Sequence, residues 1–263
     1  MLNLSSFTLY VFSFFLFLFG YIKESKKGFN VAFLLFIFAL LINFIIVLSS
    51  WYEFYIFPTI SFNDTLLFLN LVIAIMFLFF YIVYKNTYLF VFILPFIIAL
   101  FIVTFIFKNT SVVEIQKNTL LLYIHLPFSI IGTALFFISS FCGIVYFYQE
   151  RQLKKKNMKF INGMNIPLFT INRLLNNFLI SGFIIFTIGL ITGFIWRFYT
   201  VDIDKYQYEG KLIFSIITWL VFGVLISLKK IKGLTPKAVA LGSIIGMFAL
   251  ITTYIGLAIF LTG

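Results

Sequence analysis

The chain has 263 residues, of which 63% are hydrophobic, 22% aromatic and 10% charged. About a quarter of the residues of a soluble globular domain carry a charge, so this composition excludes that class and indicates an integral membrane protein. The net charge of +11 would suit a nucleic-acid surface, but most of it lies on one set of short connections, which is a signal of membrane topology. Nucleic acid is therefore not an expected partner.

Eight apolar runs are long enough to cross a bilayer. A spanning helix needs about 20 mostly apolar residues, because every backbone N–H and C=O inside the membrane must be satisfied within the segment. The runs lie at about 5–22, 29–50, 65–84, 87–107, 119–148, 173–197, 211–229 and 237–261. The first has no basic residue before it and no cleavage site after it, so we interpret it as a helix and not as a secretory signal. We predict an all-α, polytopic membrane helix bundle with eight transmembrane helices in a single integral membrane domain, 1–263.

Charge predicts the orientation of these helices. Basic residues near short connections stay on the cytoplasmic side of a membrane. One set of connections holds fourteen of the nineteen Lys and Arg residues, whereas the other holds five of them and six of the eight acidic residues. Both termini are therefore predicted on the exterior side, together with the connection that precedes the seventh run.

The longest interior connection, about 151–172, carries two further features. Its run RQLKKK, 151–156, has two interpretations, as a cytoplasmic anchor or as a binding site for anionic lipid headgroups, and we favour the anchor. The segment that follows, Pro167–Leu175, has apolar residues at helical spacing. A separate short helix at the membrane interface is predicted there.

Glycines indicate which helices pack inside the bundle. They recur at steps of four and seven residues in two runs: Gly182, Gly189 and Gly193, then Gly242 and Gly246. These steps return to the same side of a helix with 3.6 residues per turn. Small residues at such spacing let helix backbones approach closely, so both helices are predicted to pack against neighbours.

His125 is the only histidine and, away from the helix ends, the only ionisable side chain inside a predicted span. It lies about 9 Å below the outer start of its span, at 1.5 Å per residue. Pro127 follows two positions later, where a proline loosens the hydrogen-bond ladder. An imidazole can bind haem iron through one nitrogen while a hydrogen bond orients the other. From position alone, a histidine hydrogen-bonded within the bundle is the favoured interpretation.

Other arrangements for catalysis are not visible in the sequence. One histidine without a neighbouring Cys, Asp or Glu cluster does not make a zinc site. There is no GxSxG motif, phosphate-binding loop or pair of intramembrane carboxylates. Cys142 is the only cysteine, so no disulfide can form within the chain. We do not expect an enzyme.

Three blocks of the second half carry a family resemblance. They are LLYIHLPFSIIGTALFFISSFCGIVYFYQERQLKKK at 121–156, INRLLNNFLISGFIIFTIGLITGFIW at 171–196, and YQYEGKLIFSIITW at 206–219 with GLTPKAVALGSIIGMFALITTYIGLAIF at 233–260. Together they resemble the cytochrome c assembly family, the membrane proteins of the CcsA, CcmC and HemX type, and are most similar to HemX-like members. Residues 118–263 resemble the family's core, whereas the four helices of 1–117 match it only in hydropathy.

The resemblance implies a haem site. In this family a loop with the pattern W-x-W-D-P-K-E-x-W, followed by T-W in the next helix, forms a platform for haem beside axial histidines. The corresponding positions here, with the tryptophan that ends the preceding helix, are Trp196, Tyr206, Tyr208, Glu209, Lys211, Phe214 and Trp219. Tyr and Phe keep the flat ring faces that a porphyrin stacks on. His125 matches an upstream histidine and is the candidate ligand of the metal, and the family's histidine after the loop has no counterpart here.

The implied function is haem handling or cytochrome c assembly, with haem held transiently or presented at the exterior face and no chemistry by the protein itself. The implied partners are haem, other membrane proteins of cytochrome c maturation or haem biosynthesis, and the lipid bilayer. The implied location is the bacterial cytoplasmic (inner) membrane, with the aromatic-rich loop facing the exterior or periplasm. The alternative is a membrane scaffold or regulatory partner that does not bind haem. A small-solute transporter is disfavoured, because intramembrane charges and sequence repeats are lacking.

Overall fold

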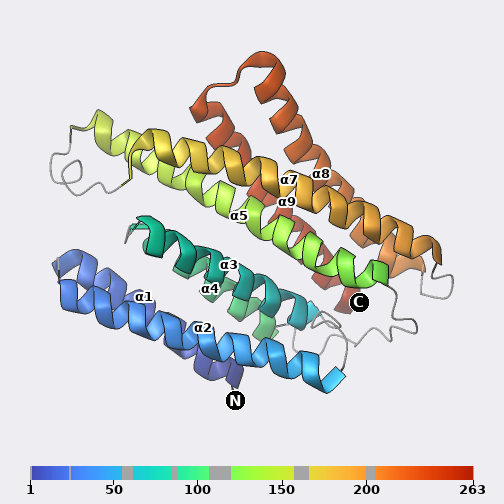
Figure 1. Cartoon of the computed structure of the whole chain (residues 1–263), viewed down its shortest axis with the longest axis horizontal. Coiled ribbons are helices and arrows are strands. Elements are labelled where there is room, and N and C mark those ends of the chain that lie inside the picture. The colour runs from blue at the N-terminus through green and yellow to red at the C-terminus, as the bar shows by residue number, and fades with distance from the viewer. Residues whose placement is uncertain are drawn as a thin grey trace. The chain divides into compact units, whose positions relative to one another are not determined.

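The computed structural model describes residues 2–23, 25–54, 62–84, 88–106, 120–156, 166–199 and 205–262 (Figure 1). Within these ranges the chain forms eight helices and no strand: α1 Leu2–Lys23, α2 Lys26–Phe54, α3 Phe62–Tyr84, α4 Tyr88–Ile106, α5 Leu120–Lys154, α7 Leu168–Tyr199, α8 Lys205–Lys232 and α9 Pro236–Thr262. Seven of them are long and apolar enough to cross a membrane, and α4 has a shorter apolar stretch, Ile93–Ile106. The predicted all-α membrane fold is confirmed, and each predicted run coincides with one described helix.

The surface of these helices suits lipid. Large apolar side chains such as Phe12, Phe79 and Ile184 are more than half exposed, at 62%, 65% and 56%. Soluble proteins rarely expose apolar surface on this scale, because water penalises it. Contact with hydrocarbon removes that penalty, so the exposure agrees with a membrane-embedded chain.

The chain divides into two compact units, Met1–Glu114 and Ile115–Gly263. The first unit contains α1 to α4, and the second contains α5 to α9. The boundary lies close to residue 118, where the family resemblance begins. The single domain predicted for 1–263 stays a prediction.

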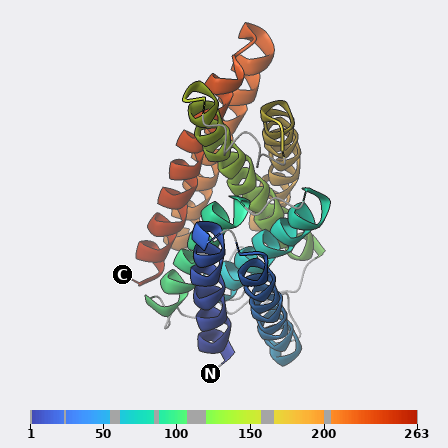
Figure 2. The same ribbon diagram turned by 90° about the vertical axis from the view of Figure 1, so that its left-hand side faces the viewer.

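In the first unit, α1 and α2 form an antiparallel hairpin whose helices lie side by side (Figures 1 and 2). Two α1 hydroxyls donate to α2 carbonyls, Ser6 Oγ to Ala39 O at 2.9 Å and Ser13 Oγ to Ala32 O at 2.8 Å. Inside hydrocarbon a hydroxyl has no water to bond, so these contacts satisfy the donor and fix the register of the pair. Aromatic rings fill much of the unit's interior, with Tyr10, Phe36, Phe77 and Phe101 almost fully buried.

In the second unit, α5 is the central helix and packs along α7 and α9. The glycine face predicted for α7 meets α5. A Cβ added to Gly182 would lie 3.0 Å from Leu135 Cβ, and one added to Gly189 would lie 2.6 Å from Ser129 Oγ. The backbones therefore approach where side chains are missing, as predicted.

The second predicted glycine pair is confirmed on α9. A Cβ on Gly242 would lie 2.3 Å from Leu225 Cδ1, and one on Gly246 would lie 2.5 Å from Phe222 Cζ. Both Leu225 and Phe222 belong to α8, so the two glycines receive large side chains from that helix. On its other side Phe222 stacks on Phe136 of α5, with ring centroids 3.8 Å apart and planes at 1°. The Phe222 ring therefore joins three helices.

Two sequence predictions about helix ends need correction. The separate interfacial helix predicted at Pro167–Leu175 is wrong, because α7 runs without a break from Leu168 to Tyr199. The Pro167 carbonyl accepts from the N–H groups of Thr170 and Ile171, so the proline begins the helix. The segment after Tyr206, which the resemblance places in a loop, forms the first turns of α8, which begins at Lys205.

Pro127 does not interrupt α5, which is continuous from Leu120 to Lys154. Proline removes one N–H from the ladder and commonly bends a helix. His125 and Ser129, on either side of the proline, both contact α7 and support the helix where the bond is missing. The effect of Pro127 is therefore the loss of one backbone N–H donor, without a break in the helix.

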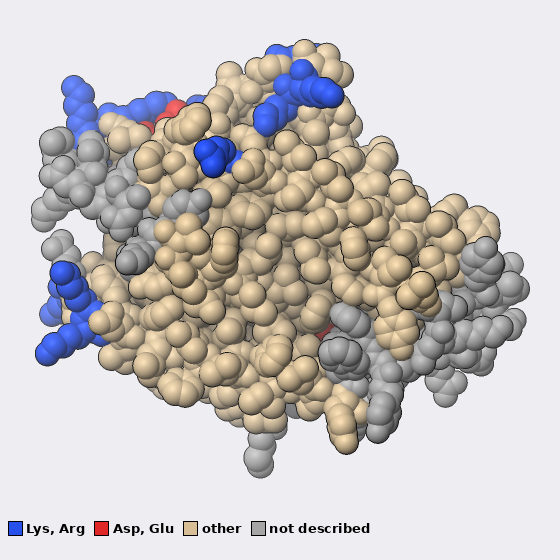
Figure 3. Space-filling model, in the orientation of Figure 1, with Lys and Arg blue, Asp and Glu red and all other residues tan. Residues whose placement is uncertain are grey.

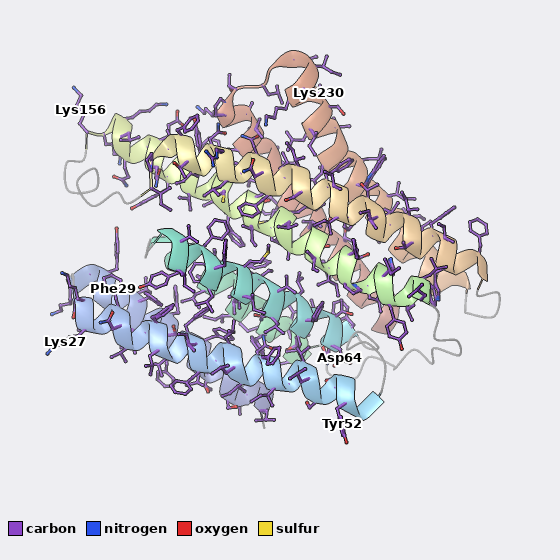
Figure 4. The ribbon with its side chains drawn as sticks, in the orientation of Figure 1. Lys27, Phe29, Tyr52, Asp64, Lys156 and Lys230 are labelled. Carbon is purple, nitrogen blue, oxygen red and sulfur yellow. The ribbon has the colours of Figure 1, made fainter. Side chains whose placement is uncertain are left out.

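Basic side chains gather at one end of each unit's helices. On the face shown in Figure 3 they lie at the α1–α2 turn of the first unit, and at the end of α5 and the α8–α9 turn of the second. Figure 4 shows Lys27 and Asp64 at opposite ends of the first unit. This segregation is the pattern from which the charge rule predicts orientation, and the side that each end faces stays a prediction.

We expect Gly132→Ala to separate α5 from α7. The added Cβ would lie 2.7 Å from the Cα of Phe186, and a helix backbone cannot move aside locally. Overpacking of this kind costs roughly 1–3 kcal/mol. Thermal unfolding in detergent measures it, with Gly223→Ala as the matched control, since that Cβ meets only the edge of the Phe183 ring at 3.2 Å. Equal unfolding temperatures for the two variants would contradict the expectation.

Candidate functional site

His125 lies on the face of α5 that meets α7. Its Nδ1 is 2.6 Å from the carbonyl oxygen of Gly189, and Ser129 Oγ is 3.2 Å from the same nitrogen. A carbonyl oxygen can only accept, so Nδ1 carries the proton. The interpretation of His125 as a histidine hydrogen-bonded within the bundle is confirmed.

This hydrogen bond also fixes the chemistry of the ring. With the proton on Nδ1, the lone pair is on Nε2, the nitrogen through which a neutral imidazole binds a metal. Metal-binding histidines almost always donate their other N–H to a carbonyl or carboxylate, which sets both tautomer and ring orientation. The contact with Gly189 is of that kind, so the residues present suit a haem iron ligand.

Two glycines of α7 form the seat of the imidazole. A Cβ on Gly193 would lie 2.4 Å from both Cε1 and Nδ1 of His125, a distance that real atoms do not reach. Gly189 leaves room in the same way for Ser129, one turn further along α5. Thr192 Oγ1 also donates to the Gly189 carbonyl, at 3.0 Å, which adds a second partner to that oxygen. Side chains at either glycine would push the ring out of its place.

Trp196 lies on the same face of α7 as this seat. It is seven residues after Gly189, which returns to within about 20° on a helix of 3.6 residues per turn. Its side chain is buried, at 4% exposure. Of the predicted site residues, Trp196 is therefore the one that the described structure places on the α7 face of His125.

Trp219 takes a different position. Its Nε1–H donates to Thr187 Oγ1 at 2.8 Å, and its ring stacks on Phe183 with centroids 5.4 Å apart. Thr187 precedes Gly189 by two residues, a rotation of about 160° by the shorter way, so Trp219 and His125 contact opposite faces of α7. The neighbouring Thr218 bonds Thr253 of α9 at 2.9 Å, which holds α8 between two helices. Trp219 is thus part of the α7–α8 contact.

The remaining predicted residues lie on α8. Phe214 is half-buried, and the side chains of Tyr206, Tyr208, Glu209 and Lys211 lie outside the described residues. Their backbone positions are the first two turns of the helix. The Phe136–Phe222 stack joins α5 and α8 at one point along their lengths, and both helices begin at the same end of the unit. His125 precedes Phe136 on α5 by eleven residues, or about three helical turns. Lys211 precedes Phe222 on α8 by the same number.

Sequence reasoning missed the seat of the histidine, although its signal is present. His125, Ser129 and Gly132 follow one another at steps of four and three, which places them on one helix face. The complementary face of α7 was identified from its glycines. Matching the two faces would have paired the imidazole with Gly189 and Gly193.

Comparison with known proteins identifies the family. Residues 1–263 match the family described as cytochrome C assembly protein. This chain belongs to that family. It is also similar to the cytochrome c biogenesis protein CcsA of Chlamydomonas reinhardtii, with 26% identity over 145 residues. That match covers 54% of this chain and 38% of CcsA, so the chain spans about two fifths of the length of this relative. No solved structure matches the chain.

The Trp219–Thr187 contact makes a quantitative prediction. A double-mutant cycle with Trp219→Phe and Thr187→Val should show coupling, because either change removes the hydrogen bond while Phe keeps the stack on Phe183. Interhelical hydrogen bonds in membranes average about 0.6 kcal/mol and reach about 1.7. The free energy of unfolding in mild denaturant measures the cycle. Strictly additive effects would show that the two side chains do not interact.

Proposed function

We propose that this protein handles haem during cytochrome c assembly, holding it transiently at the end of the second unit where α5 and α8 begin, with Nε2 of His125 as one axial ligand. The observation that carries the proposal is the Nδ1–H hydrogen bond from His125 to Gly189 in a chain of the cytochrome c assembly family. When bound, haem would supply the metal centre. The chain's own residues bind and orient it.

The surroundings of His125 support this assignment. A glycine seat holds the imidazole against α7, so little rotamer entropy remains to be lost on binding. Trp196 supplies an aromatic side chain on the same face of α7. Lys211 lies eleven residues before Phe222 on α8, as His125 lies eleven residues before Phe136 on α5, which supports a shared level. A lysine at that level suits a haem propionate, because charge-assisted hydrogen bonds to carboxylates are strong.

The aromatic residues of α8 are proposed to have two different roles. Tyr208 lies fourteen residues before Phe222, in the first turns of α8. Trp219 instead anchors α8 to α7 through Thr187. We therefore assign the stacking role to the first turns of α8 and a positioning role to Trp219.

The site would lie at the exterior side of the cytoplasmic membrane, and water or a partner of the maturation machinery would supply the other ligand of the haem iron. The chain contains no second histidine. A single protein ligand would hold haem less firmly than two would, which suits a protein that passes haem on. No catalytic step is assigned to the protein itself.

Haem titration of the detergent-solubilised protein tests the ligand. We expect a Soret band whose position shifts in His125→Ala, with affinity at least tenfold weaker, because the axial bond is lost. The control is Ser181→Ala, which alters a hydroxyl of α7 that bonds only within its own helix. An unchanged spectrum in His125→Ala would remove the assignment. Absence of any haem spectrum in the unaltered protein, with a co-purifying membrane protein, would favour the scaffold alternative.

A second pair of variants separates positioning from packing. Gly193→Ala displaces the imidazole, whereas Gly182→Ala presses on Leu135 and Phe136 and leaves His125 in place. We expect Gly193→Ala to shift the Soret band toward that of His125→Ala, and Gly182→Ala to keep the native spectrum even where it lowers the unfolding temperature. Equal spectral changes in both variants would attribute the effect to general loosening of α5 and α7.

A further inference from the structure

Three side chains of the first unit place polar groups deep among its helices. Tyr10 of α1 and Asn43 of α2 have no exposed surface, and Asn70 of α3 has 1%. Each lies seven or eight residues from the end of its span, or about 10–12 Å along the helix. Hydrocarbon offers no hydrogen bonds at that depth, so intramembrane polar groups need a partner from the protein or from a bound molecule.

The contacts around these residues bring them together. The Tyr10 hydroxyl lies beside the Asn43 side chain. On α2 and α3, Phe36 meets Phe77 with ring centroids 5.5 Å apart, and Ser50 Oγ lies 3.5 Å from Asp64 Oδ1. On α2, Asn43 lies midway between Phe36 and Ser50. On α3, Asn70 lies within one residue of the midpoint between Asp64 and Phe77. The two carboxamides therefore occupy facing positions at the same depth.

Four atoms of this cluster make no hydrogen bond of good geometry with the described residues: Tyr10 Oη, Asn43 Nδ2, Asn43 Oδ1 and Asn70 Oδ1. Tyr10 and Asn43 are close enough to interact, but their geometry falls short of a direct hydrogen bond. The other amide atom of Asn70 is satisfied, since Nδ2 donates to the Ile97 carbonyl at 3.0 Å. Buried polar atoms of folded proteins are nearly always paired with protein or with ordered water. Several such atoms at the same depth on facing helices indicate a shared partner.

The chemistry of the cluster selects that partner. Its groups are neutral and include both donors and acceptors, a phenol and two carboxamides. A cation would meet no carboxylate there, because the nearest described acid on α3, Asp64, lies six residues or about 9 Å away and contacts Ser50. Water donates two hydrogen bonds and accepts two, and it needs only about one probe sphere of space.

We propose that the first unit binds water inside the membrane, held among Tyr10, Asn43 and Asn70. The rings of Phe36 and Phe101 lie against the Tyr10 ring, with centroids 5.7 Å away in both cases, and form apolar walls of the site. The bound water forms the hydrogen bonds that the two carboxamides and the phenol do not form with one another. It thereby links α1, α2 and α3.

X-ray hydroxyl-radical footprinting of the full chain in lipid nanodiscs tests the proposal. X-rays split bound water where it lies, and the radicals oxidise adjacent rings, which mass spectrometry quantifies. We expect Tyr10 and Phe36 to be oxidised several-fold faster than Phe17, which is equally buried on α1, at 1% exposure, and is not part of the cluster. Equal rates for Phe36 and Phe17 would overturn the proposal and show that the three side chains pair directly.

A double variant, Asn43→Leu with Asn70→Leu, removes the carboxamides. We expect the Phe36 rate to fall to that of Phe17, while Ser13→Ala leaves it unchanged, because the Ser13 hydroxyl already bonds the Ala32 carbonyl. Persistent labelling of Phe36 in the double variant would also overturn the proposal. Should that variant fail to give a monodisperse protein, Tyr10→Phe keeps the ring, removes one partner of the water, and serves for the same comparison through Phe36.

Discussion

The close approach of α5 and α7 is the constraint on which the second unit depends. Lipid is as apolar as a leucine side chain, so no hydrophobic force presses two helices together inside a membrane. Packing and interhelical hydrogen bonds must supply the attraction, and both require short distances. Gly132 on α5 and Gly182, Gly189 and Gly193 on α7 remove the side chains that would hold the backbones apart. The seat of His125 is a consequence of that approach.

Hydrogen bonds from small polar side chains to the carbonyls of a neighbouring helix then set the register. Ser139 Oγ donates to Leu175 O of α7, and Ser140 Oγ donates to Ser243 O of α9. His125 uses the same arrangement with a larger group, since its Nδ1–H reaches Gly189 O. A serine side chain has one polar atom, whereas a histidine ring has two nitrogens. One nitrogen can therefore fix the helix pair while the other remains chemically suited to a metal.

The sequence predicted the spans well because hydropathy and length follow directly from the absence of water in a bilayer. It also predicted the glycine faces, because residue spacing on a helix of 3.6 residues per turn determines which residues share a face. Helix ends were less predictable, since the start of α7 depends on hydrogen bonds to the Pro167 carbonyl and not on hydropathy. The placement of Trp219 could not be predicted, because the face of α7 that it contacts is known only once Thr187 is identified as its partner.

In both units the way a buried polar group is satisfied depends on the kind of side chain. A hydroxyl has one proton to donate, so a single neighbouring carbonyl satisfies it, as for Ser6, Ser13, Ser139 and Ser140. A carboxamide has two donor protons and an oxygen with two lone pairs. Helix carbonyls can take its protons but offer nothing to its oxygen, because the backbone N–H groups are already used within the helices. An asparagine buried between helices therefore needs a partner that donates. Asn70 is an example, since its nitrogen is bonded while its oxygen has no partner among the residues that the structure describes.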